Sequence, residues 1–544
     1  MAHEQEKIVR SAGVVSISVF ASRVSGLVRE IIMARLFGAG QIYDAFLLGF
    51  RIPNLTRDLF AEGALSSAFI PTFTHYLKTK SREEAAVLAN LVTAAIVVVV
   101  GSFCVLGMIF SPELVRLLAP GFALVPGKFE LAVELTRIMF PFLLLVALAA
   151  QAMGMLNACG QFGVPAMSST FFNIGSITFG LTIGFLLGPR LGFDPIIGMG
   201  IGVVLGGALQ LLWQVPSLRR SGFSFRLRTG WSHPGLQQIL RLMGPAILGN
   251  AAVQVNVMVN TNFASGISDP VTGPDGPVSW LGYAFRFMQL PLGLFGVAIG
   301  SATLPAVSQS VSLGRMDEFR QTVSRSLGMV FLLTLPSSVG LALLGESMIG
   351  VIYEGGKFRP YDTQQTALAL TYYAVGLGGY AALKVLTPAF YALADGRTPM
   401  FVSMGSILIN YLVAASMVRT GTLGHAGLAM ATSAVAWFGC LVLFWILRGR
   451  VSGVYGRRLF ESVGKIVVAS VVMGIAVVLM SRSIATWLGV TRTARLIDLA
   501  VSIPGGVLIF CAACRVLRVA ELELAGRALF APVMKWAARQ RAKI

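Results

Sequence analysis

Charged side chains inside apolar segments are the residues of this sequence that could do chemistry. Arg23, Arg29 and Arg57 lie in the first two apolar segments, and Arg286 lies in a later one. A charged side chain near the middle of a bilayer costs about 2.5–3.5 kcal/mol on insertion scales, so these groups need water or an anion beside them. Guanidinium groups bind phosphate through two parallel hydrogen bonds. The pattern therefore predicts a hydrated cationic cavity for a phosphate or a pyrophosphate.

Further charges accompany these arginines, and no recognisable catalytic motif does. Asp44 and Glu62 could neutralise neighbouring arginines, and Glu30 and Arg51 could support the same cluster. A P-loop, a zinc-protease motif and a nucleophile elbow are absent from the sequence, and the five cysteines and four histidines have no metal-ligand spacing. We therefore predict no catalytic residue, no metal site and no cofactor.

The composition indicates the elements that must position these charges. Of the 544 residues, 55% are hydrophobic and only 12% are charged, against about a quarter charged in soluble proteins. Apolar stretches of about 20 residues, the length that crosses a bilayer as a helix, recur along the chain. We predict an all-α polytopic membrane protein of about 14 transmembrane helices. The expected helices are 12–37, 43–76, 87–110, 130–157, 163–188, 194–214, 236–265, 278–312, 326–350, 364–393, 399–418, 423–447, 462–481 and 496–516.

The net charge of +19 marks orientation rather than a nucleic-acid partner. With the N-terminus in the cytoplasm, most of the 43 lysines and arginines fall in loops and a tail on the cytoplasmic side. This predicts that both termini are cytoplasmic. The basic loop 215–235 is expected to lie on the anionic inner leaflet. The first apolar segment is interrupted by arginines, so it is expected to be a retained helix rather than a cleaved signal peptide.

An internal repeat suggests how the helices are organised. Residues 50–60 align with residues 285–295 at an offset of about 235, and residues 160–165 align with 396–399 at nearly the same offset. Duplicated halves around a central site are common in transporters. We therefore expect two six-helix lobes in a pseudo-twofold arrangement, with two extra helices. The predicted domains are 1–235, 236–455 and 456–544.

Several sequence runs closely resemble the MurJ/MviN family. They are Ser22-Arg-Val-Ser-Gly-Leu-Val-Arg-Glu, Ala34-Arg-Leu-Phe-Gly-Ala-Gly, Asp44-Ala-Phe, Phe50-Arg-Ile-Pro-Asn-Leu, Leu59-Phe-Ala-Glu-Gly-Ala, Gly244-Pro-Ala-Ile-Leu-Gly, Gly296-Val-Ala-Ile-Gly and Gly356-Lys-Phe. The family contains the lipid II flippases of bacterial peptidoglycan synthesis, within the multidrug/oligosaccharidyl-lipid/polysaccharide exporter superfamily. The resemblance covers the first twelve predicted helices well and the last two mainly by their number.

The resemblance implies a transporter, not an enzyme, that works by alternating access. The pyrophosphate and sugars of lipid II would occupy the central cavity, and the two last helices would form a groove for the lipid tail. The arginines that match the family's substrate-binding positions are Arg23, Arg29, Arg57 and Arg286, and the matching functional or gating acids are Asp44 and Glu62. The expected location is the bacterial cytoplasmic membrane. The expected partners are lipid II, membrane lipids and cell-wall synthesis proteins.

One departure from the family pattern concerns the helix that carries Arg286. Many relatives have an acid directly before this arginine and another shortly after it, whereas this chain has Phe285 and Gln289. The departure removes any ion pair of Arg286 with those positions and leaves its charge for the substrate.

Alternative functions and coupling modes remain open from the sequence. The chain could export another polyprenyl-linked glycan or a drug, although a cationic drug would favour an acid-rich cavity. A membrane enzyme would be expected to show carboxylates or histidines clustered on a large loop. Transport could be coupled to the membrane potential, or to sodium through polar residues such as Asn256, Asn260 and Asn410.

Overall fold

The computed structural model describes residues 2–57, 65–226, 228, 230–421, 423–451, 453 and 456–524. Every regular element within these ranges is a helix. The one pairing of extended backbone in the same ranges is an isolated bridge between Asp269 and Gly273. The predicted all-α class is therefore confirmed for the described residues.

The chain divides into two compact units. The first contains Met1–Ser279 and Gly356–Phe358, and the second contains Trp280–Gly355 and Arg359–Ile544. The predicted boundaries near residues 235 and 455, and the repeat relation between two lobes, stay predictions.

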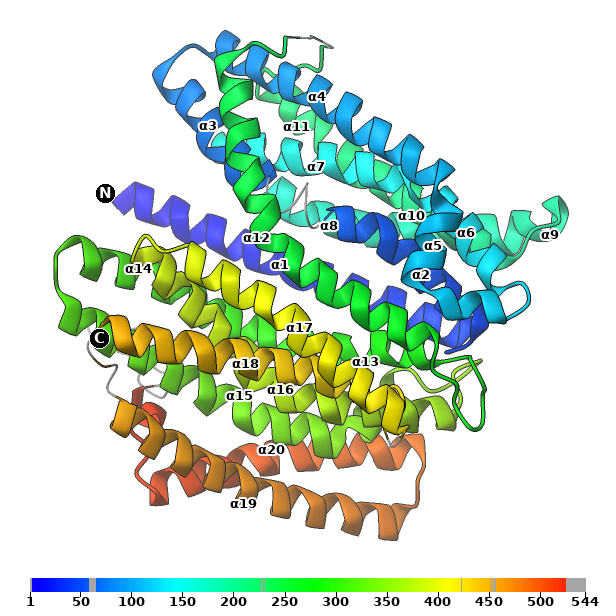
Figure 1. Ribbon diagram of the computed structural model, residues 1–544, viewed down its shortest axis with the longest axis vertical. Helices are drawn as coiled ribbons and strands as arrows, with labels where there is room; N and C mark the ends of the chain where they lie inside the picture. Colours follow the sequence, from blue (N-terminus) through cyan, green and yellow to red (C-terminus); the bar gives the residue numbers. More distant parts are fainter. Residues whose placement is uncertain are drawn as a thin grey trace, which may run out of the picture. The chain divides into compact units, whose positions relative to one another are not determined.

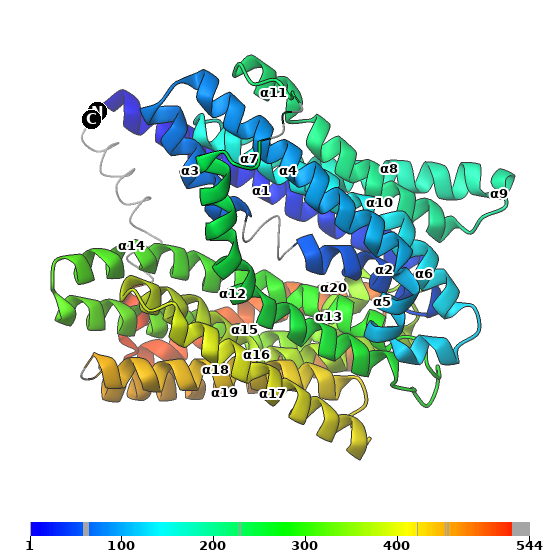
Figure 2. The same ribbon diagram turned by 45° about the horizontal axis from the view of Figure 1, so that its top comes forward.

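The first unit is built from helices that pack around small residues. These helices are α1 (Ala2–Phe37), α2 (Gln41–Arg57), α3 (Ser66–Thr79), α4 (Arg82–Ile109), α5 (Ser111–Leu118), α6 (Lys128–Met139), α7 (Pro141–Ala158), α8 (Gly163–Leu181), α9 (Gly188–Leu191), α10 (Pro195–Leu212), α11 (Val215–Arg220) and α12 (Pro234–Ser265). Helices α8 and α10 lie side by side (Figure 2). A Cβ atom on Gly202 of α10 would lie 2.6 Å from the Cα atom of Gly180 in α8, so glycine permits this close approach.

The second unit surrounds one central helix. Its helices are α13 (Pro277–Pro291), which begins in the first unit, α14 (Ala298–Ser312), α15 (Met316–Ile352), α16 (Pro360–Ala392), α17 (Arg397–Thr420), α18 (Ala426–Arg450), α19 (Gly456–Leu488) and α20 (Arg492–Val516). In the most apolar window of α16, 67% of the residues are buried, against 22% in α17 and α20. Helix α16 therefore lies at the centre of this unit (Figure 1) and α17 and α20 lie at its periphery.

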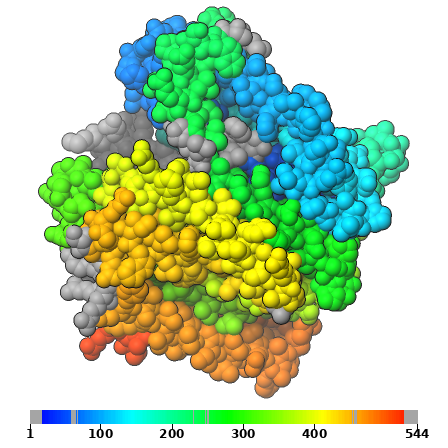
Figure 3. Space-filling view, in the orientation of Figure 1, coloured from blue at the N-terminus to red at the C-terminus, as the bar shows by residue number. Residues whose placement is uncertain are grey.

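The outer face of α17 has the pattern of a helix that contacts lipid. Phe401, Met404, Leu408 and Leu412 recur at intervals of three or four residues and are all more than half exposed. Helices α17 and α18 form part of the viewed surface of the second unit (Figure 3, yellow to orange). A row of large apolar side chains on one exposed helix face is stable in hydrocarbon and costly in water.

Eleven helices in the described residues are long and apolar enough to cross a membrane. They cover eleven of the 14 predicted spans, so the polytopic architecture is confirmed and the count of 14 is not. The three predicted spans outside this set are 12–37, 43–76 and 236–265, and each includes positions that the structure leaves partly undescribed.

Several predicted helices are divided in the structure, as the following two illustrate. The predicted helix 43–76 is interrupted, because α2 ends at Arg57, α3 begins at Ser66, and the intervening 58–64 lie outside the described residues. The predicted helix 130–157 consists of α6 and α7, which meet at Phe140 before Pro141. Proline has no backbone N–H to continue the hydrogen-bond ladder, which explains the second interruption.

Candidate functional site

Two of the predicted binding arginines lie on α1 in different environments. Arg23 is exposed, whereas the side chain of Arg29 is only 16% exposed. The Arg29 guanidinium lies 5.9 Å from the ring centre of Phe50 and 5.3 Å from that of Phe172, and 3.7 Å from a carboxylate oxygen of Glu30. Aromatic faces attract cations, so the two rings restrain this guanidinium.

Helix α8 fixes the rotation of α1 beside these arginines. Asn173 of α8 is 7% exposed and donates from its amide to the Ser22 carbonyl (3.2 Å) and to the Ser25 hydroxyl oxygen (3.1 Å). Phe172, the preceding residue of α8, contacts Arg29. Phe172 and Asn173, two adjacent residues of α8, therefore contact the part of α1 that carries the two arginines.

The other predicted charges are distributed over α2 and α13. Arg51 donates to the Thr261 hydroxyl at 2.6 Å, which joins α2 to α12. Arg57 is the last residue of α2 and is half-buried, and Arg286 is exposed on the part of α13 that belongs to the second unit. Glu62 lies outside the described residues. The common cavity of the four arginines stays a prediction.

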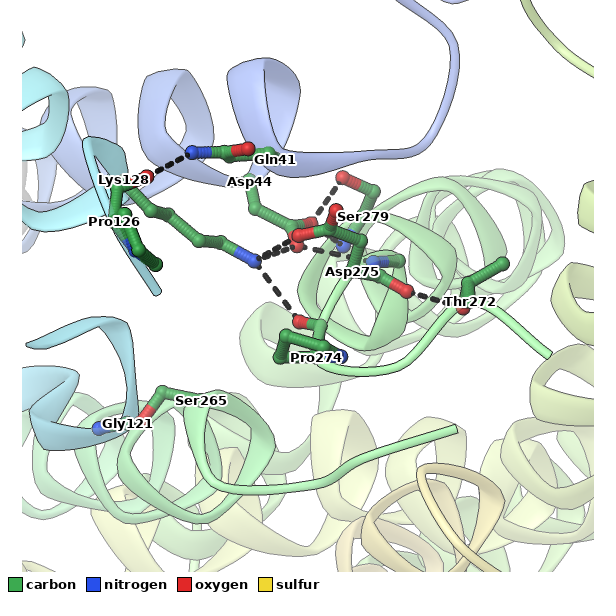
Figure 4. A network of polar contacts seen from close by, with 11 residues as sticks. Gln41, Asp44, Gly121, Pro126, Lys128, Ser265, Thr272, Pro274, Asp275 and Ser279 are labelled. Atoms are coloured by element: carbon green, nitrogen blue, oxygen red, sulfur yellow. Dashed lines mark hydrogen bonds and ion pairs between the residues drawn. The ribbon is translucent and has the colours of Figure 1, made fainter. Parts of the chain in front are cut away.

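Asp44 lies at the centre of a buried network in the first unit (Figure 4). The residue is fully buried near the start of α2. Its two carboxylate oxygens accept hydrogen bonds from the backbone N–H groups of Gly276 (3.1 Å) and Ser279 (2.9 Å) and from the Ser279 hydroxyl. Gly276 and Ser279 flank the start of α13, so Asp44 caps this helix from another part of the chain.

Lys128 supplies the positive charge of this network. It is the first residue of α6, its side chain has no exposed surface, and its ammonium lies 2.8 Å from Asp44 and 2.9 Å from Asp275. The ammonium also donates to the Pro274 carbonyl at 2.9 Å and lies 4.6 Å from the Phe122 ring centre. All three ammonium hydrogens therefore have an oxygen acceptor.

The network links α2 and α6 to the helix that carries Arg286. Ser279 and Arg286 are seven residues apart, about two turns of α13, and so lie near the same face of the helix. The interpretation that Asp44 neutralises an arginine is wrong, because its ion-pair partner is Lys128. A substitution in this buried cluster would therefore alter the hydrogen bonds that hold the N-terminus of α13.

Sequence reasoning missed Lys128 and Asp275. Lys128 follows a Pro126-Gly127 turn and resembles an ordinary loop lysine, and Asp275 lies in a Gly-rich connection. Their partner Asp44 is 84 residues from Lys128 and 231 residues before Asp275 along the chain. The available signal was Asp44 itself, a carboxylate in an apolar segment that requires a compensating charge.

Phe285 and Gln289, the two positions where this chain departs from the family pattern, have different environments in the structure. Phe285 packs against Tyr373 with ring centres 5.4 Å apart, and Gln289 is exposed. The position before Arg286 therefore contributes to packing within the second unit.

A short segment after α15 joins the end of α1. The backbone N–H of Lys357 donates to the Arg35 carbonyl at 2.9 Å. Gly356 has a φ of +59°, and a Cβ atom there would lie 2.2 Å from the Arg35 carbonyl oxygen. Both the dihedral angle and the close approach require glycine, which gives the sequence Gly356-Lys-Phe a structural reason.

Comparisons with known proteins agree on one family. The sequence model described as "Lipid II flippase MurJ" matches residues 33–497. A "Probable lipid II flippase MurJ" of Vibrio cholerae is 34% identical over 493 residues, which are 89% of this chain and 91% of that protein. A "Lipid II flippase MurJ" of Burkholderia cenocepacia is 33% identical over 438 residues, which are 80% and 82% of the two chains.

Solved structures give the same result for the fold. A structure titled "Lipid II flippase MurJ, inward closed conformation" matches with a TM-score of 0.74 and 26% identity, over 92% of this chain and 99% of that chain. An inward-facing multidrug transporter of the MATE family matches with a TM-score of 0.66 and 16% identity, over 81% and 94% of the two chains. The second likeness concerns the fold alone.

Proposed function

The chain belongs to the lipid II flippase MurJ family, and from this premise we propose that it carries lipid II from the cytoplasmic to the periplasmic leaflet of the bacterial inner membrane. The observation that carries the proposal is the family match over residues 33–497. The arginines of α1, α2 and α13 supply the chemistry that a pyrophosphate group needs, because each guanidinium offers a planar pair of donors.

The restrained position of Arg29 supports a binding role. A free arginine side chain loses rotamer entropy when it binds an anion, whereas the rings of Phe50 and Phe172 already limit the motion of this guanidinium. The Glu30 carboxylate lies 3.7 Å from the guanidinium, which is longer than a direct charge-assisted hydrogen bond. The Arg29 side chain therefore loses less rotamer entropy when it binds a phosphate than a freely moving arginine would.

The Asp44 cluster supports a role in conformational change. Alternating access requires that helices move between two packings, and α13 carries the Asp44 contact at its start and a predicted binding residue, Arg286, two turns further on. We infer that the cluster holds α13 in one of these packings. Transport requires no covalent step in this scheme.

Other functions of the superfamily have less support. The likeness to the multidrug transporter extends to the fold alone at 16% identity. Arginines suit anionic cargo and disfavour the cationic drugs that an acid-rich cavity would bind. A flippase for another polyprenyl-pyrophosphate glycan would use the same arginines, so the test must include lipid II itself.

The decisive experiment replaces the native lipid II flippase of a bacterium with this chain. We expect the chain to restore growth and the appearance of lipid II in the outer leaflet after depletion of the native protein. Arg29→Ala removes a charge-assisted contact of about 1.5–3 kcal/mol, so we expect roughly 10- to 100-fold weaker binding of lipid II and loss of rescue. Arg29→Lys keeps the charge without the planar fork and should rescue partly.

Arg315→Ala is the matched control for this experiment. Arg315 is an arginine with a 61% exposed side chain, paired with Glu318 on the surface of the second unit, so its removal should leave rescue intact. Full rescue by Arg29→Ala at equal membrane abundance would remove the binding role of Arg29. A chain that restores neither growth nor exposure of lipid II would contradict the proposed function.

A further inference from the structure

A buried carboxylate lies on α20 in the second unit. Asp498 is 4% exposed, although it belongs to a candidate membrane span, Arg492–Val516. Three serine hydroxyls from three helices surround it. They are Ser347 of α15 at 2.6 Å, Ser481 of α19 at 3.0 Å and Ser502 of α20 at 2.8 Å.

No basic side chain compensates the charge of this carboxylate. Within the described ranges, no lysine, arginine or histidine nitrogen lies within 4.0 Å of Asp498. Arg495, one turn earlier in α20, pairs with Glu354 at 2.5 Å and with Glu346 at 3.9 Å. Arg482 and Arg492 are exposed. A buried carboxylate with hydroxyl partners alone costs free energy in a membrane-spanning region unless a positive charge joins it.

We propose that Asp498 and its three serines bind a single sodium ion. The two carboxylate oxygens and three hydroxyl oxygens form a set of five hard oxygen ligands, and each hydroxyl can turn a lone pair toward a cation. One carboxylate balances one monovalent charge, whereas a divalent ion would leave an uncompensated charge in a buried place. The hydroxyls now donate to the carboxylate at 2.6–3.0 Å, so the cluster must expand to admit an ion, and a small ion requires less expansion than potassium.

The surroundings of the site differ on its two sides. Ser347 and Ser481 are half-buried, and Asp498 is six residues from the start of α20, about 9 Å at 1.5 Å per residue. On the other side, Leu344, Val477 and Phe510 belong to an apolar cluster of α15, α19 and α20. An ion therefore enters from the end of the helices and joins all three of them above this cluster.

The site at Asp498 contains none of the asparagines that the sequence suggested for sodium binding, which are Asn256, Asn260 and Asn410. The proposal of a sodium site also does not depend on which substrate the protein transports. Its ligands come from α15 and from the two last helices, which pack against each other in the second unit (Figure 1). A bound ion would fix α19 and α20 on α15. Loss of the ion would weaken this attachment, so the stability of the protein is a direct readout.

The test measures thermal unfolding of the full chain in detergent as a function of sodium chloride, with choline chloride added to keep the ionic strength constant. We expect the unfolding midpoint to rise with the logarithm of the sodium concentration, because the ion binds the folded state. Potassium should give a smaller rise. Binding of radioactive sodium should approach one ion per chain, and Asp498→Asn should lose both the rise and the bound ion.

Two further variants keep the test decisive. Ser502→Ala removes one ligand with little change in packing, so it should fold and require more sodium for the same rise, even if Asp498→Asn does not fold. Asp395→Asn changes a carboxylate that also accepts from a hydroxyl, but one that is paired with Arg450 in the loop before α17, and should keep the full response. An equal sodium response in wild type, Asp498→Asn and Ser502→Ala would overturn the proposal. The proposal would also be overturned if the unfolding midpoint depended on pH or on the potassium concentration as strongly as on the sodium concentration.

Discussion

At the scale of single residues, the buried contact between Lys128 and Asp44 determines how the start of α13 is held. A fully buried ion pair stabilises little relative to apolar residues of the same shape, because both ions lose their hydration. Removal of one partner is different, since it leaves the other charge buried and uncompensated. The Lys128 ammonium also contacts the Pro274 carbonyl, the Phe122 ring and Asp275, whose side chain is 32% exposed and can be hydrated, so the uncompensated charge after removal of the ammonium is that of the fully buried Asp44.

Lys128→Met is therefore expected to reduce the free energy of unfolding by about 3–5 kcal/mol. The matched control is Lys80→Met, because Lys80 forms an exposed pair with Glu84 one turn away (3.4 Å) and should contribute about 0.3–0.5 kcal/mol. Denaturant unfolding of both variants in the same detergent measures the difference. Similar losses in the two variants would show that the Lys128 network does not hold the first unit together.

At the scale of helices, the space beside a glycine determines whether alanine can replace it without separating the helices. A Cβ atom on Gly202 would lie 2.6 Å from both the Gly180 Cα atom and the Ser176 carbonyl oxygen, whereas a Cβ atom on Gly464 of α19 would meet nothing within 4 Å. Backbone atoms cannot move aside as a flexible side chain can. Gly202→Ala must therefore separate α8 from α10.

We expect Gly202→Ala to cost about 1–3 kcal/mol through overpacking. Gly464→Ala, the same substitution in an open position, should be neutral or should stabilise by up to about 1 kcal/mol, because alanine restricts the unfolded chain. Thermal unfolding of the two variants in parallel gives the comparison. A Gly202→Ala protein that is as stable as Gly464→Ala would refute the close contact between α8 and α10.

The loop before α17 offers a test of pH dependence. The Thr398 hydroxyl (2.6 Å) and backbone N–H (3.0 Å) donate to Asp395, Arg450 and the Arg397 N–H add to them, and together these donors lower the pKa of Asp395 below its usual value. A carboxyl with a lowered folded pKa stabilises the protein above its unfolded pKa of about 3.9, and this contribution is lost as the pH falls toward the folded value.

Asp395→Asn should therefore lower the unfolding midpoint at neutral pH and have a smaller effect in acid. The difference in midpoint between wild type and the variant is measured from pH 7 down to about pH 3, below the unfolded pKa of an aspartate. A difference that stays constant over this range would show that the ionised carboxylate does not contribute. Arg450→Ala should give a weaker version of the same trend, since it removes one donor of several.

At the scale of the whole molecule, apolar length and glycine or proline positions predict most helices, because these features act within one stretch of chain. Eleven of the 14 predicted spans are confirmed in the described residues for this reason. The partner of Asp44 could not be found in this way, since Lys128 and Ser279 reach it only through the packing of separate helices. The Asp498 cluster has the same origin, because three unremarkable serines meet one carboxylate only when α15, α19 and α20 pack together.

We propose that the direction of transport by the whole chain follows from the charge of the cargo and the field across the membrane. An inside-negative potential of 100 mV favours outward movement of each negative charge by about 2.3 kcal/mol, which corresponds to up to about 50-fold in a distribution between the leaflets. In proteoliposomes that contain fluorescent lipid II, an imposed inside-negative potential should therefore speed outward transfer by this chain. The effect should disappear when an ionophore collapses the potential and should be absent with Arg29→Ala. Equal rates of transfer with and without the imposed potential would indicate that a cation compensates the negative charge of lipid II during transfer. The sodium site at Asp498 is a candidate source of that cation. In that case, replacement of sodium by choline would change the rate of transfer.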